Sequence, residues 1–195
     1  MSDQTLPPKS GASALDPAKD SLVTTVHLAL GGNLGDRRAN LSAAIDRLGA
    51  LLRIDRLSAV YETAPMYVTD QPAFLNMALS GTTDLAPREL LRAVKRIEEE
   101  LGRNLDGLRF GPRPIDIDIL FQGALVMASP DLEIPHPRIA ERAFVLCPLA
   151  DIAADLRHPA LGRTIAELLA GAPGRDSVVR VADALEPHPP SPSTI

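Results

Sequence analysis

Aspartate alternates with isoleucine between Ile115 and Ile119, and this pattern constrains the fold more than any other part of the sequence. Successive side chains point to opposite faces of a strand, so Asp116 and Asp118 share one face and the isoleucines share the other. One face therefore joins a hydrophobic core, while the other carries two carboxylates about 7 Å apart. A bare Asp-x-Asp is more often the solvated face of an edge strand. The flanking Arg109 and Arg113, with a Gly-Pro turn between them, favour a binding site.

This pair of carboxylates is suited to a divalent metal. Two close carboxylates repel each other in a partly buried site, and a divalent cation removes that repulsion. Magnesium commonly takes one or two protein carboxylates, keeps several waters and completes its octahedron with phosphate oxygens of a substrate. The planar guanidinium groups of Arg109 and Arg113 can hold the same phosphates. The strand therefore predicts a magnesium and phosphate site.

Composition limits the partners of such a site. The chain has 195 residues, 45% of them hydrophobic, which is enough for a core of its own and most simply one domain. Its formal net charge of −5 gives no basic field, so we expect neither nucleic-acid nor membrane partners, and phosphate binding must be local. A single cysteine, Cys147, excludes an internal disulfide and a cysteine zinc cluster, which fits a cytoplasmic location. No run of apolar residues suits a signal peptide or a membrane span.

The periodicity of apolar residues predicts alternating strands and helices. We expect strands over 23–30, 54–63, 74–82, 115–121 and 124–128, and helices over 37–52, 87–101, 139–154 and 164–170. The first six elements follow the order β-α-β-β-α-β, which is typical of an α+β, ferredoxin-like fold with helices packed on an antiparallel sheet. The last two helices are C-terminal additions. We expect a single domain over 22–185, with a disordered leader at 1–21 and a disordered tail at 186–195.

Five motifs in order resemble the 6-hydroxymethyl-7,8-dihydropterin pyrophosphokinases. They are the turn Gly-Gly-Asn-Leu-Gly-Asp-Arg at 31–37, Tyr61-x-Thr63-x-Pro65, Asp70-Gln71-Pro72-x-Phe74-Leu75-Asn76, the stretch 111–120, and Ile-Pro-His-Pro-Arg at 134–138. Five linked motifs in this order are far more specific than one short pattern. The resemblance implies that ATP, as co-substrate, donates its β,γ-pyrophosphoryl group to the pterin hydroxymethyl oxygen and releases AMP, on the route to folate.

The resemblance also implies a role for each matching residue. Asp116 and Asp118 match the ligands of two magnesium ions that bridge the triphosphate and the pterin hydroxyl. The catalytic set is Arg103, Arg109, Arg113, Asp116 and Asp118. The pterin positions are Thr63, Pro65, Met66, Phe74, Asn76 and Phe144, of which the two phenylalanines stack on the pterin and Asn76 bonds its amide edge. The ATP positions are Glu98, Arg113, Ile119, His136 and Arg142, with Ile119 beside the adenine.

Some positions depart from the family pattern, and some have a simpler explanation. The departures are Tyr67, Leu105, Phe110 and Pro114, where the family more often has glycine, arginine, tryptophan, and threonine or serine. In the simpler interpretation, Phe74 and Phe144 are core residues and His136 is a structural residue of a loop. A non-catalytic ligand sensor is the competing class of protein, since ferredoxin-like domains serve many functions. Release of AMP distinguishes an enzyme from a ligand sensor. We expect the protein to be a monomer.

Overall fold

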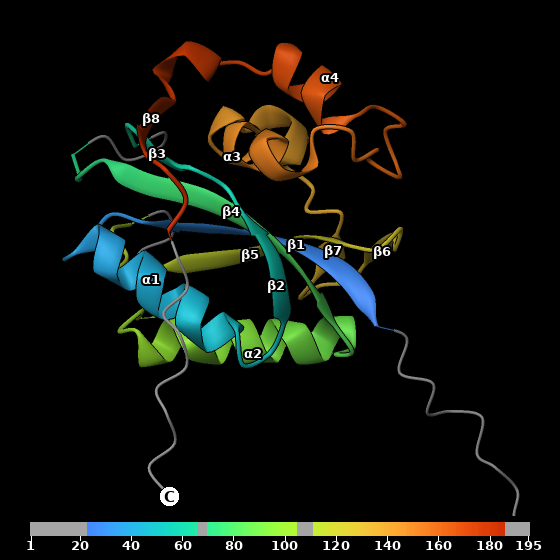
Figure 1. Cartoon of the computed structure of the whole chain (residues 1–195), viewed down its shortest axis with the longest axis horizontal. Coiled ribbons are helices and arrows are strands. Elements are labelled where there is room, and N and C mark those ends of the chain that lie inside the picture. The colour runs from blue at the N-terminus through green and yellow to red at the C-terminus, as the bar shows by residue number, and fades with distance from the viewer. Residues whose placement is uncertain (1–22, 66–69, 105–110, 186–195) are drawn as a thin grey trace, which may run out of the picture.

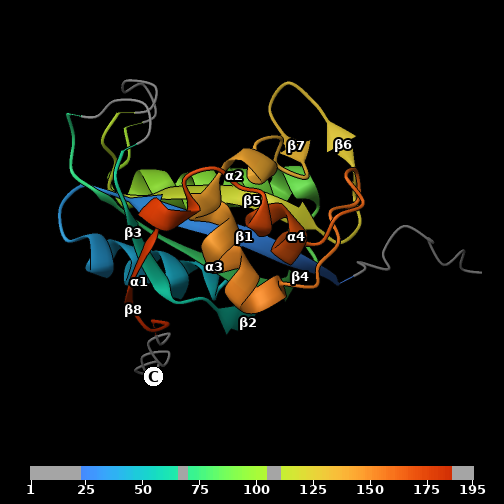
Figure 2. The same ribbon diagram turned by 90° about the horizontal axis from the view of Figure 1, so that it is seen from above.

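The computed structural model describes residues 23–65, 70–104 and 111–185 (Figure 1). A central sheet lies between two layers of helices. Helices α1 (Arg37–Leu48) and α2 (Pro87–Glu100) cover one face, and α3 (Ala143–Ala153) and α4 (Ile165–Ala170) cover the other. In the view of Figure 2, α3 and α4 lie over the strands. The expected leader at 1–21 and the expected tail at 186–195 lie outside the described residues.

Every strand pair in the main sheet is antiparallel. The strands are β1 (Thr24–Gly32), β2 (Arg53–Leu57), β3 (Val60–Thr63), β4 (Phe74–Thr83), β5 (Asp116–Gln122) and β8 (Val179–Ala182). They lie in the order β5-β1-β4-β3-β8, and β2 also pairs with β4. A separate ribbon joins β6 (Met127–Ala128) to β7 (Glu133–Ile134), and short 3-10 helices span Ile139–Glu141 and Arg175–Ser177. The prediction of an α+β, ferredoxin-like fold with C-terminal helices is confirmed.

The residues of β5 contribute to two parts of the core, and the alternation of its side chains is interrupted near its end. Ile117 and Ile119 pack with α1 and α2, whereas Leu120 and Phe121 pack with α3 and α4. The pairing with β1 shifts at this point, because His27 lies opposite Phe121 while Leu28 lies opposite Ile119. This bulge leaves Leu120 between the two pairs, and its carbonyl accepts a hydrogen bond of 3.1 Å from the backbone N–H of His136. The bulge therefore helps to fix His136.

Local hydrogen bonds explain where the main helices begin. The Asp36 carboxylate accepts from the backbone N–H of Ala39 at 3.0 Å and caps α1. Helix α2 begins at Pro87, and the Glu89 side chain accepts from the backbone N–H of Ala86 at 3.0 Å. These bonds satisfy backbone N–H groups at the helix starts, and the apolar stripes of both helices pack in one core cluster with the sheet.

Some predicted boundaries are wrong. The strand expected over 54–63 is divided into β2 and β3, because the Ser58 hydroxyl accepts from the backbone N–H of Ala78 at 2.8 Å and replaces a regular ladder contact. The helix expected over 37–52 ends at Leu48, and the one expected over 139–154 begins as a 3-10 turn. The strand expected over 124–128 is only β6. Strands β7 and β8 were not predicted from the sequence, and in β8 both valines are exposed.

In the described part of the chain, no helix is both long enough and apolar enough to cross a membrane.

Gly32 allows the end of β1 to contact the segment before β5. The backbone N–H groups of Asn33 and Leu34 both donate to the Arg113 carbonyl, at 2.9 and 3.2 Å. A Cβ atom on Gly32 would lie 2.1 Å from the Pro114 carbonyl oxygen. We predict that Gly32→Ala lowers the free energy of unfolding by about 1–3 kcal/mol, the usual cost of overpacking, as measured by urea denaturation.

Gly171→Ala is the matched control, because the nearest atom to its Cβ would lie at 3.6 Å. We expect it to change the free energy of unfolding by less than about 0.5 kcal/mol. Equal losses in the two variants would contradict the close approach at Gly32.

Candidate active site

A cleft of about 280 Å³ opens beside the carboxylate face of β5. Its walls come from β1, β3, β4, α2, β5 and the start of α3. Most of the predicted site residues that the structure describes line it: Thr63, Phe74, Asn76, Arg103, Arg113, Asp116, Asp118, His136, Arg142 and Phe144. Met66 and Arg109 lie outside the described residues, as do Tyr67, Leu105 and Phe110. Pro65 is described but is not among the lining residues.

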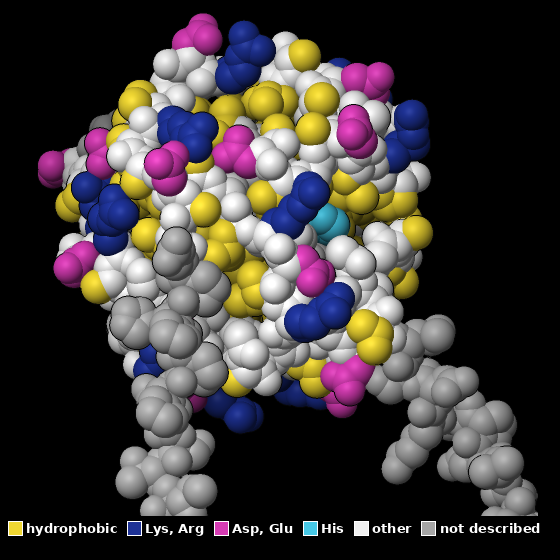
Figure 3. Space-filling model, in the orientation of Figure 1, with side chains coloured by type: hydrophobic (Ala, Val, Ile, Leu, Met, Phe, Trp, Pro, Cys, Tyr) yellow, Lys and Arg dark blue, Asp and Glu magenta, His cyan; other side chains and the backbone are white. Residues whose placement is uncertain are grey.

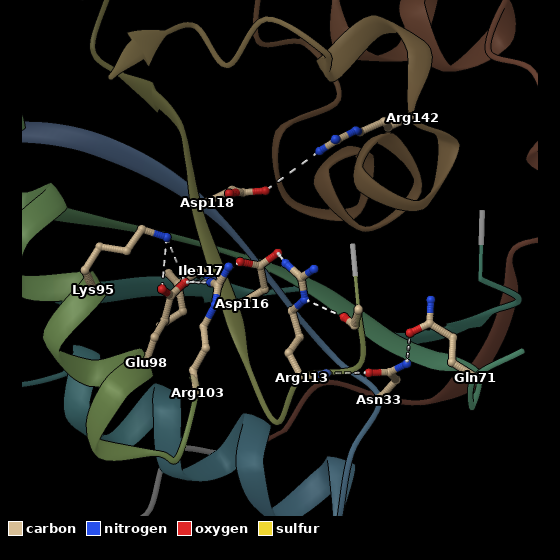
Figure 4. Close-up of polar contacts among 11 residues, drawn as sticks. Asn33, Gln71, Lys95, Glu98, Arg103, Arg113, Asp116, Ile117, Asp118 and Arg142 are labelled. Atoms are coloured by element: carbon tan, nitrogen blue, oxygen red, sulfur yellow. Dashed lines mark hydrogen bonds and ion pairs between the residues drawn. The ribbon is translucent and has the colours of Figure 1, made fainter. Parts of the chain in front are cut away.

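Two arginines bind Asp116 (Figure 4). Arg103 Nη1 contacts one carboxylate oxygen, and Arg113 Nη1 donates to the other at 3.1 Å. Burial alone would raise the pKa of Asp116, but the charges of Arg103 and Arg113 outweigh it and hold the pKa below its usual value. Asp116 is therefore a stable carboxylate at neutral pH.

Asp118 lies in a different electrostatic environment. Its closest ion-pair contact is Arg142 Nη1, at 3.9 Å. Burial and, secondly, the charge of Asp116 raise the pKa of Asp118 above its ordinary value, although His136, Lys95 and Arg142 oppose this. The carboxylate of Asp118 is thus less compensated than that of Asp116, and a further cation beside it would stabilise its charged form.

Glu98 lies behind Arg103 and does not line the cleft. Its side chain is fully buried, and its Oε1 lies 2.6 Å from Arg103 Nη1 and accepts from the backbone N–H of Ile117 at 2.6 Å. Lys95 Nζ donates to the two carboxylate oxygens at 3.1 and 2.9 Å. Burial raises the pKa of Glu98 in spite of these contacts. The position of Glu98 favours a role in holding Arg103, and not the direct contact with ATP that the sequence predicts.

The other end of the cleft presents aromatic faces and an amide. Asn76 is nearly buried, and its Nδ2 donates to Thr63 Oγ1 at 2.9 Å. A Cβ on Gly31 would lie 2.9 Å from Asn76 Oδ1, so glycine makes room for this carboxamide. Phe74 and Phe144 are only partly buried, and both line the cleft. Their partial exposure favours ligand contact over a plain core role.

His136 lines the cleft, but the Ile119 side chain does not. Burial lowers the pKa of His136, so this imidazole is neutral at pH 7, and its Nδ1 accepts from the backbone N–H of Arg138 at 3.2 Å. Ile119 is 4% exposed and packs with the α1 and α2 side of the core. The alternation that exposes Asp118 turns the Ile119 side chain to the opposite face, and the place of Ile119 beside the adenine stays a prediction.

Lys95 was not predicted from the sequence as a site residue, and neither were the hydrogen bonds of Asn33. Lys95 lines the cleft and lies three residues before Glu98 on α2, a spacing that could have revealed it. From the sequence, Asn33 was known only as part of the turn at 31–37. Its Nδ2 instead donates to Gln71 Oε1 at 3.1 Å and to the Pro72 carbonyl at 3.0 Å, while its Oδ1 accepts from the backbone N–H of Arg113 at 2.8 Å. Asn33 thus connects both ends of the cleft.

The acid pair fits magnesium better than a metal held only by protein. Among the described residues, no group of three or more His, Cys, Asp or Glu side chains is arranged to hold a metal ion. Two carboxylates on one strand face leave most coordination positions for water and phosphate oxygens, which is how magnesium commonly binds with nucleotides. The raised pKa of Asp118 also shows a carboxylate that an added cation would stabilise.

The fold is α+β with an antiparallel sheet, and its cleft combines arginines and paired carboxylates with an aromatic pocket. Together these features define a site of the nucleotide phosphotransferase class. The chain belongs to the 7,8-dihydro-6-hydroxymethylpterin-pyrophosphokinase (HPPK) family, whose sequence profile matches residues 27–154. The family expected from the five motifs is therefore confirmed.

Named relatives agree with this membership. The 2-amino-4-hydroxy-6-hydroxymethyldihydropteridine pyrophosphokinase of Pseudomonas aeruginosa is 44% identical over 78% of this chain and 94% of its own length. The mitochondrial folate synthesis bifunctional protein of Pisum sativum is 52% identical over 65% of this chain but 25% of its own length, so the chain spans about a quarter of that relative. A crystal structure of Plasmodium falciparum HPPK-DHPS has a TM-score of 0.66 at 18% identity, covering 78% of this chain and 46% of that one, and supports the fold.

Removing the charge of Glu98 tests its role in holding the arginine. Glu98→Gln keeps an oxygen for the Ile117 N–H but removes the negative charge between Lys95 and Arg103. We predict a free energy of unfolding lower by about 1–3 kcal/mol, the usual contribution of charge-assisted hydrogen bonds, measured by urea denaturation. Glu99→Gln removes the same charge from an exposed neighbour and should have little effect. A loss no larger than that of Glu99→Gln would refute this role.

Proposed function

We propose that this chain transfers pyrophosphate from ATP to the hydroxymethyl group of 6-hydroxymethyl-7,8-dihydropterin and releases AMP, in folate biosynthesis. The observation that carries the proposal is one cleft with a carboxylate pair and arginines at one end and partly exposed phenylalanines with a fixed carboxamide at the other. Family membership and the names of the bacterial relatives support the same reaction.

The pterin end of the cleft suits a flat heteroaromatic ring. Phe74 and Phe144 offer apolar faces for stacking, and Asn76, oriented by Thr63, offers an amide for the edge of the ring. Pro65 and Met66 are proposed to contribute beside them. When the ring and the amide edge of the pterin are both held, its hydroxymethyl group is oriented toward the phosphate end. Such orientation supplies a large part of the rate enhancement in reactions of two substrates.

The arginines neutralise charge at the phosphate end. In the proposed reaction the pterin hydroxyl oxygen forms a bond to the β-phosphorus and loses its proton to water. The bond from that phosphorus to the α-phosphate oxygen breaks, and AMP leaves with that oxygen. Arg103, Arg113 and Arg142 reach the cleft as cations, and Arg109 is proposed to join them. His136 is proposed to bind ATP as a neutral donor. Positioning and electrostatics suffice, so no covalent enzyme intermediate is required.

Asp116 and Asp118 are the proposed ligands of two magnesium ions. Bound magnesium would neutralise the charge that develops on the transferred phosphates. The protein's own contribution is to hold both carboxylates on one strand face, with Asp116 fixed by two arginines.

The remaining proposals concern partners and location. Lys, Arg, Asp and Glu side chains are mixed over the face shown in Figure 3, and the formal net charge is −5. The absence of a nucleic-acid partner stays a prediction that rests on this net charge. A single domain over 22–185, a monomer and the absence of membrane partners stay predictions. So does a cytoplasmic location, because the Pisum sativum relative is described as mitochondrial.

The proposed function predicts magnesium-dependent release of AMP from ATP and the pterin. We expect Asp118→Asn to lower kcat/KM by about 10²–10³-fold, the scale on which loss of one transition-state charge contact is felt. Asp155→Asn, at an exposed position outside the cleft, is the control and should keep normal activity. Chromatographic measurement of AMP with and without a chelator makes the test. Binding of the pterin without AMP release would instead identify a ligand sensor.

A further inference from the structure

Residues at the base of the connection between β3 and β4 form part of the pterin end of the cleft. Thr63 ends β3 and pairs with Phe74, which begins β4. Both residues line the cleft, and Thr63 also accepts the hydrogen bond that orients Asn76. The distance between the last residue of one strand and the first residue of the next therefore sets the shape of this end of the cleft.

A single guanidinium holds both strand ends from outside the cleft. Arg37, the first residue of α1, directs its Nη1 to Glu62 Oε2 at 2.8 Å and to the Ala73 carbonyl at 2.8 Å. Glu62 directly precedes Thr63, and Ala73 directly precedes Phe74. Arg37 does not line the cleft itself. Its two contacts thus fix the neighbours of two lining residues without touching the space where a substrate would bind.

The turn that carries Arg37 reinforces this contact. Asn33, four residues earlier, donates to the Pro72 carbonyl at 3.0 Å, so the carbonyls of two consecutive residues, Pro72 and Ala73, are both bound by side chains of this turn. The Arg37 and Glu62 side chains are 31% and 39% exposed. An ion pair so exposed contributes little to global stability, so its main effect is local geometry.

We infer that Arg37 is a positioning residue for the pterin end of the cleft: by binding Glu62 and the Ala73 carbonyl, it holds Thr63 and Phe74 at the separation that a stacked pterin requires. This inference rests on the proposed function and assigns Arg37 no contact with either substrate. Its loss therefore weakens use of the pterin while leaving the phosphate end of the cleft intact.

The experiment compares Arg37→Met with Arg38→Met. Arg38 is the next residue of the same helix and is exposed, so the control makes the same chemical change without the two contacts. For Arg37→Met we expect the KM for the pterin to rise about tenfold, the combined effect of losing two hydrogen bonds that contribute about threefold each. The KM for ATP and kcat should change by less than about twofold, and Arg38→Met should match the original chain.

A second variant keeps the test decisive if Arg37→Met does not fold. Glu62→Leu removes one of the two contacts and leaves the Ala73 carbonyl bond, so the KM for the pterin should rise about threefold, a smaller effect than losing both. The inference is overturned if Arg37→Met raises the KM for the pterin no more than Arg38→Met does. If only Glu62→Leu folds, the same comparison is made with that variant. An equal rise in the KM for ATP also overturns it.

Calorimetry separates this inference from the proposed function. Pterin binding is titrated in the presence of magnesium and a non-hydrolysable ATP analogue, which requires no turnover. If the original chain releases no AMP, the proposed reaction fails. A weaker pterin affinity in Arg37→Met than in Arg38→Met would still support the positioning role, and equal affinities would refute it.

Discussion

The partly buried charge of Asp116 is the constraint on which the site depends. Placing a carboxylate in this cleft beside a second one is unfavourable unless cations lie against it, and Arg103 and Arg113 supply them. Arg103 in turn contacts the fully buried Glu98, which also binds the backbone of β5 at Ile117. These ion pairs and the hydrogen bond from Ile117 to Glu98 therefore join α2 to β5.

The turn after β1 connects the two ends of the cleft. Gly31 and Gly32 lack the Cβ atoms that would meet Asn76 and Pro114, so the turn lies against both the amide end and the acid end. Asn33 then bonds the backbone of Arg113 on one side and Gln71 with Pro72 on the other. One short turn thus contacts both substrate segments, which explains why a glycine-rich sequence is required there.

Sequence patterns predicted the face of a helix or strand on which a residue lies better than they predicted its contacts with other residues. Period-two alternation placed Asp116 and Asp118 on one face, and the order of elements with five motifs gave the fold and the family. The same alternation explains why the Ile119 side chain lies in the core. The burial of Glu98 was not predictable, because it depends on Arg103 and on a backbone N–H of another element. Strand β8 is four residues long and half exposed, so its place in the sheet comes from pairing with β3.

The balance of charges in the cleft explains why the acid pair is unequal. Among the described residues at the phosphate end, the cations Lys95, Arg103, Arg113 and Arg142 face the carboxylates of Glu98, Asp116 and Asp118. Two of the cations lie against Asp116 and two against Glu98, with Arg103 shared, whereas Asp118 has only Arg142 at 3.9 Å. A triphosphate brings several more negative charges, which the small positive excess does not neutralise. Divalent cations bound with the nucleotide would supply the difference, and Asp118 is the carboxylate with most to gain from them.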